Sequence, residues 1–321
     1  MNDMMGGFFG IELPAYNNFP FTESTNCVFC NSGRTALDCI LRNLPRPRRI
    51  YLPRFTCDSV TEPLAGIPTM RYGCENNLAP ILPDDAGEDD IIILSDYFGL
   101  TANHVKRAAE QFPGRSIVDA TTALFRRDSD NKLPTFYSPR KFVGIPDGGI
   151  ACAPFPLTRQ PQHGESSAEF ALHLLQRLES GAAAAAPAAQ RLEDSLHGKR
   201  LRMSPLSRKL LNTIDFASVA KRRMENYSIL HRALQELNRL PLPEIPDSAP
   251  MCYPFVSGIP KLRDELIDAG IALPLFWPEV LENTHPVSTE YKLAGTLLPL
   301  PLDQRYDRHD MNFLLRLILG E

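Results

Sequence analysis

Residues 136–149 read FYSPRKFVGIPDGG and set one lysine, Lys141, between a Ser-Pro turn signal and a run of Gly, Pro and Asp. A tight loop of this composition holds a lysine by its backbone rather than on a flexible helix face. A lysine that is desolvated in such a loop loses its proton more easily and becomes a nucleophile toward carbonyl carbons. Two interpretations stand side by side: a solvated surface lysine, or a lysine that forms a Schiff base with a carbonyl compound.

The bulk composition is that of an ordinary globular protein, with 321 residues, 43% hydrophobic and 22% charged. A net charge of -4 provides no basic field for nucleic acid or lipid headgroups, so neither partner is expected. No apolar run approaches the roughly 20 residues that a membrane span requires. The first residues lack the basic and apolar regions of a secretory signal, and a cytoplasmic location is expected.

Seven cysteines are scattered along the chain, which favours reduced thiols. Cys27 and Cys30 form one CxxC pair, interpreted either as packed core thiols, which we favour, or as a redox pair. No second pair follows at zinc-ligand spacing, and the seven histidines are dispersed. No metal site is therefore predicted.

Short apolar runs at residues 49–53, 69–72, 90–94 and 116–118 alternate with helical patterns such as 102–112. Continuous apolar runs are typical of strands buried on both faces, so the sequence predicts an α/β three-layer sandwich with a mainly parallel sheet. Ligands in such sheets gather at the carboxyl ends of the strands. Asp119 and Tyr97 are expected just beyond two such ends.

Residues 1–25 show no periodicity and are interpreted as an extended arm, followed by a large domain over residues 26–214. Helices are expected at 170–178 and at 181–196, where the alanine-rich segment 181–189 is broken at Pro187 and has no chemistry assigned. A long amphipathic helix at 215–237 begins a smaller C-terminal α/β domain, residues 215–321. There we expect strands at 254–259 and 297–302, a strand or extended run at 272–278, and helices at 261–269 and 308–319.

Two further features point to an anionic cofactor. The turn at Ser32 and Gly33 opens an amphipathic helix, whose free N–H groups and dipole would face a phosphate; an ordinary helix start is the alternative. Asp119 follows an apolar strand, where it is interpreted either as a helix cap or turn former or as the carboxylate beneath a pyridinium nitrogen. With Lys141, these residues fit pyridoxal 5'-phosphate (PLP).

Five motifs in this order resemble the DegT/DnrJ/StrS-type aminotransferases, which are PLP enzymes of the aspartate aminotransferase fold that commonly act on nucleotide-linked keto-sugars. The motifs are NSGRTAL (31–37), YLPRFTCDSV (51–60), DYFGL (96–100), VDATTALF (118–125) and SPRKFVGIPDGG (138–149). The resemblance continues more loosely through RLRMS, KRRMENY and LPLDQRY. It implies an aminotransferase that uses an amino acid donor and a keto or aldehyde acceptor, and a homodimer with shared active sites.

The resemblance also implies roles for single residues. Lys141 would form the internal aldimine and Asp119 would pair with the pyridine nitrogen. The remaining cofactor-binding positions would be Ser32, Gly33, Arg34 and Ser138 at the phosphate, with Cys57 where the family usually has a ring-stacking aromatic and Thr122 where it usually has Gln. Gly148 and Gly149 match the small pair after the lysine loop.

Candidate substrate residues are Tyr97, Arg200, Arg202 and Arg305. The Arg202-Met203-Ser204 segment resembles one that reaches the neighbouring subunit in the family, whereas Arg200 replaces an asparagine. Arg305 is a candidate for a carboxylate or phosphate, with a surface ion pair to Asp303 or Asp307 as the alternative. A non-catalytic member of the fold and a PLP-dependent lyase or dehydratase remain the alternatives to an aminotransferase.

Overall fold

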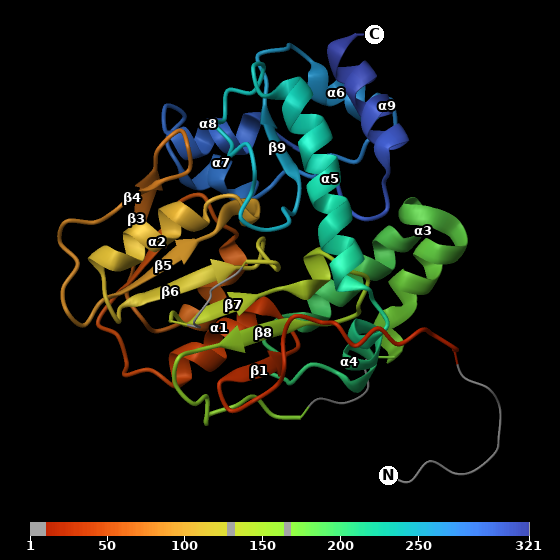
Figure 1. Ribbon diagram of the computed structural model, residues 1–321. Coiled ribbons are helices and arrows are strands. Elements are labelled where there is room, and N and C mark those ends of the chain that lie inside the picture. The colour runs from red at the N-terminus through yellow and green to blue at the C-terminus, as the bar shows by residue number, and fades with distance from the viewer. Residues whose placement is uncertain (1–10, 127–131, 164–167, 321) are drawn as a thin grey trace, which may run out of the picture.

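The computed structural model describes residues 11–126, 132–163 and 168–320, and its centre is an eight-stranded sheet (Figure 1). Its strands are β1 (Cys27–Cys30), β2 (Ile50–Pro53), β3 (Thr69–Cys74), β4 (Pro80–Ile81), β5 (Ile91–Ser95), β6 (Ser116–Ala120), β7 (Thr135–Tyr137) and β8 (Gly149–Cys152). They lie in the order β1-β8-β7-β6-β5-β2-β3-β4. The central strands β7, β6, β5, β2 and β3 are parallel neighbours, whereas β8 runs antiparallel to both β7 and β1.

Helices cover both faces of the sheet, which confirms the predicted three-layer α/β architecture. Helix α1 (Gly33–Arg42) packs on the face that carries Ile93 and Ile117. Helix α2 (Ala102–Gln111) packs on the other face, which carries Ile92 and Val118. Successive strand residues point to opposite faces, so each strand needs apolar side chains at consecutive positions.

The CxxC thiols lie on opposite faces of the sheet, because Cys27 and Cys30 are three positions apart in β1. Cys27 contacts Cys152 of the paired strand β8, with 2.7 Å between the two Sγ atoms, whereas Cys30 packs beneath α1. A Cys27–Cys30 redox pair is thus excluded, and the favoured interpretation as core thiols is confirmed. Among the described residues, no His, Cys, Asp and Glu cluster suits a metal ion.

The C-terminal part builds a second, two-stranded antiparallel sheet, which Figure 1 shows beside the long helix α5. The 3-10 turn η4 (Ala168–Ala171) precedes this part, whose elements are α3 (Leu172–Leu196), α4 (Pro205–Asn212), α5 (Phe216–Leu234), β9 (Tyr253–Val256), α6 (Leu262–Asp268), α7 (Glu279–Asn283), α8 (Thr289–Thr296), β10 (Leu297–Leu300) and α9 (Arg308–Leu319). Pro254 and Pro299 are opposite each other in β9 and β10. Each strand of a two-stranded sheet has an outer edge where a missing N–H donor is tolerated.

Several local predictions were wrong. Strands β1, β7 and β8 were not expected, because they are only three or four residues long, and β1 and β8 also carry cysteine or glycine. Asp119 lies inside β6 rather than beyond its end. Helix α3 continues through Pro187, and its break is at Gly181, whose φ of 86° only glycine adopts without strain. Residues 272–278 pair with no strand, so the extended alternative holds.

The arm is irregular over residues 11–23 and lies against this chain's own core. Phe19 packs on Phe216 at the start of α5, with ring centroids 4.8 Å apart, and Phe21 packs on Tyr137 of β7 at 4.7 Å. The helices of the described residues are all too short or too polar to cross a bilayer.

Candidate active site

The ends of the parallel strands β6 and β7 bring Asp119 and Lys141 to one place. Asp119 is the fourth residue of β6, and Lys141 ends the short 3-10 turn η3 (Pro139–Lys141) that follows β7. Thr121 joins them: its backbone N–H donates to Asp119 Oδ1 at 2.9 Å, and its Oγ1 accepts from Lys141 Nζ at 3.2 Å. An acid and an amine that are distant in sequence therefore contact the same threonine.

Burial and mutual attraction act in opposite directions on this pair. Burial raises the pKa of Asp119, and the charge of Lys141 partly counteracts this rise. The pKa of Lys141 is lowered, chiefly because surrounding protein desolvates its amine, whereas Asp119 and Cys57 act to raise it. The lysine side chain remains accessible to solvent. The site thus offers an approachable amine that loses its proton more easily than an ordinary lysine.

The N-terminus of α1 lies directly beside this pair. Ser32 caps the helix, and its side chain accepts from the Thr35 N–H at 3.2 Å. A Cβ atom at Gly33 would lie 3.2 Å from Thr121 Cγ2 and 3.8 Å from Ser138 Cβ. The predicted phosphate residues Ser32, Gly33 and Ser138 are therefore neighbours, at a helix end where free N–H groups and the dipole favour an anion.

The glycine pair after the lysine loop is what allows α1 to approach so closely. The Gly148 N–H donates to Asn31 O at 2.8 Å. A Cβ atom at Gly149 would lie only 2.0 Å from Ser32 O. Any side chain at Gly149 would push β8 away from the residues that cap α1.

Three other predicted cofactor positions are engaged by the protein itself. Arg34 contacts Glu62 at 3.4 Å and His197 at 3.0 Å. The Thr122 hydroxyl donates to Asp96 O at 3.0 Å and accepts from the Phe98 N–H at 3.1 Å. The Cys57 thiol, which precedes the 3-10 helix η1 (Asp58–Leu64), lies 3.1 Å from Ser59 Oγ.

Tyr97 belongs to an aromatic cluster between the large sheet and the C-terminal part. Its hydroxyl donates to Phe55 O at 2.8 Å, and its ring lies 5.8 Å from that of Trp277. Phe98 stacks on Trp277 with 14° between the planes, and both have a positive φ, 60° and 55°. Trp277 therefore packs between the two parts of the chain.

The three predicted substrate arginines bond to other groups within this chain. Arg200 pairs with Asp38 at 3.1 Å, and Arg202 contacts Glu23 at 3.5 Å and bonds to Gln160. Two nitrogens of Arg305 each contact a carboxylate oxygen of Asp303 at 2.7 Å, which is the surface ion pair considered as the alternative.

The sequence reasoning missed two residues that shape the site. Thr121 lies in the quoted VDATTALF motif, but only the three-dimensional structure shows that it joins Asp119 to Lys141. Asp96, in DYFGL, is fully buried beside Asp119, and it pairs with Arg126 at 2.8 Å. Its position directly before Tyr97 in that motif was the available signal.

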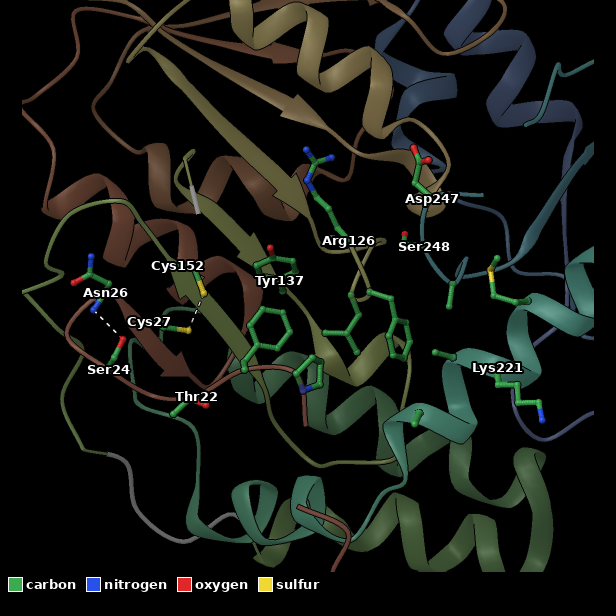
Figure 2. A pocket seen from close by; sticks show the side chains of 18 residues that line it. Thr22, Ser24, Asn26, Cys27, Arg126, Tyr137, Cys152, Lys221, Asp247 and Ser248 are labelled. Atoms are coloured by element: carbon green, nitrogen blue, oxygen red, sulfur yellow. Dashed lines mark hydrogen bonds between the residues drawn. The ribbon is translucent and has the colours of Figure 1, made fainter. Parts of the chain in front are cut away.

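A cavity of about 970 Å³ lies on the sheet face opposite α1 and is separate from the Lys141–Asp119 pair. Figure 2 shows Tyr137 and the Cys27–Cys152 contact on one side of it, and Arg126, Ser248 and Lys221 on the other. Side chains alternate along β7, so Tyr137 faces this cavity whereas Phe136 packs beneath α1.

No family model and no curated protein matches this sequence. The structure, in contrast, is similar to solved aminotransferases. S. venezuelae DesV, solved with a ketimine intermediate, superposes with a TM-score of 0.68 at 15% identity, over 95% of this chain and 86% of DesV. A DegT DnrJ EryC1 StrS aminotransferase from Brucella abortus superposes with a TM-score of 0.61 at 18% identity, over 92% of this chain and 85% of that one.

A dehydratase is also similar, namely GDP-4-keto-6-deoxymannose-3-dehydratase (ColD). Its TM-score is 0.62 at 14% identity, over 91% of this chain and 88% of ColD. The resemblance found in the sequence is thus confirmed for the fold. Across almost its whole described length, this chain has the fold of the DegT/DnrJ/EryC1/StrS-type sugar aminotransferases.

Proposed function

We propose that this protein is a PLP-dependent aminotransferase that moves an amino group from an amino acid to a keto or aldehyde acceptor, with nucleotide-linked keto-sugars as the first acceptor class to examine. The observation that carries the proposal is the meeting of Lys141 and Asp119 on Thr121, beside the N-terminus of α1. A lyase or dehydratase would use many of the same residues, so the reaction itself has to be measured.

The residues present fit PLP. The start of α1 with Ser32, Gly33 and Ser138 would hold the phosphate. Asp119 would hold the ring nitrogen from within the sheet, and Lys141 would reach the aldehyde carbon. When bound, the cofactor supplies an electron sink for the charge that develops at the donor's α-carbon.

The chain's own groups would divide the proton chemistry between them. The Lys141 amine, released from its contact with Thr121, would act first as nucleophile and then as general base at the α-carbon. A lowered pKa keeps more of this amine neutral near pH 7. Asp119 would keep a proton on the ring nitrogen, and its burial excludes water from that hydrogen bond.

We also propose a homodimer, in which Arg202 and the segment around it approach the partner's site. The proposal rests on the family resemblance, because within one chain Arg200 and Arg202 bond away from Lys141. Light scattering on a sizing column measures the mass directly. A monomer at micromolar concentration would contradict it.

The cofactor proposal is tested with the full-length protein and added PLP. We expect a visible absorbance band that borohydride abolishes, with the cofactor mass retained on the peptide that contains Lys141. Lys141→Ala should lose both signals. Lys221→Ala is the matched control, because Lys221 is exposed and its one ion pair with a described residue is to Glu225 at 4.0 Å. Absence of the band in wild-type protein would refute the proposal.

The reaction is tested with 15N-labelled glutamate and a panel of keto acceptors. Appearance of the label in the acceptor supports an aminotransferase. Loss of water or ammonia from the substrate without transfer of the label would identify a lyase or dehydratase instead. A cofactor band with no turnover on any acceptor would indicate a non-catalytic member of the fold.

A further inference from the structure

Arg223, on helix α5, is a charged side chain in the protein interior, with only 1% of its surface exposed. Its guanidinium donates from Nε to Gln304 Oε1 at 3.1 Å, from Nη1 to Pro250 O and Met251 O at 3.0 Å each, and from Nη2 to Phe142 O at 3.2 Å. The guanidinium carbon also lies 4.9 Å from the centre of the Phe142 ring. Two of these contacts are to the residue that follows Lys141.

Gln304 completes a closed ring of hydrogen bonds with Arg223 and Phe142. Its Nε2 donates to the same carbonyl, Phe142 O, at 2.9 Å. Because Gln304 Oε1 accepts from Arg223 Nε, the orientation of the amide is set by its two partners: a flipped amide would place an NH₂ group against the guanidinium. The Phe142 carbonyl thus accepts two bonds, both from residues of the C-terminal part.

Packing alone does not account for an arginine at this position. The direct acceptors of Arg223 are neutral oxygens, and among the described residues no carboxylate forms an ion pair with it. Burial lowers its pKa to about 10, with partial compensation by Asp303. An apolar side chain of similar volume would fill the space without this desolvation cost.

The hydrogen bonds from Arg223 and Gln304 reach the backbone of the turn that carries Lys141. Lys141 and Phe142 follow β7 in a short turn, in which Lys141 N donates to Ser138 O at 3.2 Å and Phe142 N donates to Pro139 O at 2.9 Å. Val143 N donates to the same Pro139 O at 3.1 Å, and these three backbone bonds set the local shape of the turn. The contacts of Phe142 O and of the Phe142 ring tie the turn to the rest of the protein. Arg223 and Gln304 both donate to Phe142 O, and Arg223 also lies over the Phe142 ring, which packs against Phe125 with 5.9 Å between the ring centroids.

We propose that Arg223 and Gln304 are positioning residues for Lys141, which hold the lysine turn from the C-terminal part of the chain through Phe142 O. The proposal deepens the proposed function and rests on it for its catalytic meaning. It also predicts that the placement of Lys141 depends on how the C-terminal part docks on the sheet.

We call the hydrogen bonds from Arg223 and Gln304 to Phe142 O the clamp. The test uses two clamp variants, each of which removes one of these donors, and a matched control. Arg223→Gln removes the guanidinium, and Gln304→Met keeps the volume while removing the donor to Phe142 O. Arg222→Gln is the control on the same helix, because Arg222 is partly exposed and contacts only Glu225 at 3.9 Å among described ion pairs. Thermal unfolding of each variant records any general loss of stability.

The first measurement needs no bound cofactor. Full-length protein is treated with hydroxylamine, dialysed, and acylated with acetic anhydride over a series of pH values, and modification of Lys141 is followed by mass spectrometry. Release of the turn lets the accessible amine move further from the protein groups that desolvate it, so the pH midpoint of Lys141 acylation should rise by about half a pH unit in both variants. At a pH below the midpoint, a shift of about half a unit lowers the fraction of neutral Lys141 amine about threefold relative to wild type. Arg222→Gln should match wild type.

The second measurement is the PLP dissociation constant from the absorbance band, which should rise about tenfold in the clamp variants. A lower unfolding temperature with an unchanged Lys141 midpoint would show a purely structural role and refute the proposal. If Arg223→Gln fails to fold, Gln304→Met decides by the same criterion. If wild-type protein binds no PLP, the proposed function fails, and the acylation series still decides whether the clamp positions Lys141.

Discussion

Replacement of Gly149 by alanine should separate β8 from the start of α1. The ideal Cβ would lie 2.0 Å from Ser32 O and 2.7 Å from Gly33 N, both backbone atoms that cannot rotate away. An ordinary contact begins near 3.4 Å, so β8 and α1 must separate by about 1.4 Å (3.4 − 2.0). That shift acts on the β1–β8 register, in which Gly149 pairs with Cys30, and on the bond from Gly148 N to Asn31 O.

The expected cost is about 2–5 kcal/mol. Forced overpacking contributes about 1–3 kcal/mol, and one or two weakened hydrogen bonds contribute about 1 kcal/mol each. With an unfolding entropy of about 2.1 cal/mol/K per residue, a chain of 321 residues should lose about 3–7 °C in unfolding temperature. Calorimetry measures the unfolding temperature, and urea titration with a fluorescence readout measures the free energy of unfolding.

Two neighbouring glycines serve as graded controls. At Gly144 an added Cβ would meet only Leu174 Cδ2 at 3.5 Å, so Gly144→Ala should stay within about 1 kcal/mol of wild type. At Gly148 the nearest atom is the flexible end of Ile145 at 2.9 Å, so Gly148→Ala should fall between the other two. Equal stability of Gly149→Ala and Gly144→Ala would refute the reasoning.

Two buried acids give predictions with a definite pH dependence. Burial raises the pKa of Asp119, so its ionised form costs stability, and the cost grows as pH rises from the unfolded to the folded pKa. Without cofactor, Asp119→Asn should therefore unfold at equal or higher urea than wild type at pH 7 and converge with it below pH 4; a clear loss of stability at pH 7 would contradict this. With PLP added, the rate of amino transfer by Asp119→Asn should fall at least about 100-fold. Arg126→Met leaves Asp96 buried without its 2.8 Å partner and should cost about 3–5 kcal/mol at pH 7. The pKa of Asp96 is already raised by burial, so the loss should shrink as pH falls and the acid is protonated; urea titrations that show a loss independent of pH would argue against it.

Local sequence was sufficient for the layers of the fold and for the local structure around the candidate site residues Ser32 and Lys141. Apolar runs such as residues 90–94 predict doubly buried strands, because neither face of the sheet meets water. The cap at Ser32 and the loop at Lys141 are likewise set by a few consecutive residues. These features depend on periodicity and turn chemistry, which short segments contain.

The tertiary structure alone decided which of these residues meet. Thr121 joins Asp119 to Lys141 because β6 and β7 are parallel neighbours, and no local pattern gives strand order. Gly149 is required by the backbone of Ser32, more than a hundred residues earlier. Arg223 reaches the lysine turn only because α5 packs on the sheet. Strand order and helix docking are set by burial summed over the whole chain, which is why residue spacing predicts the parts of the site but not their contacts.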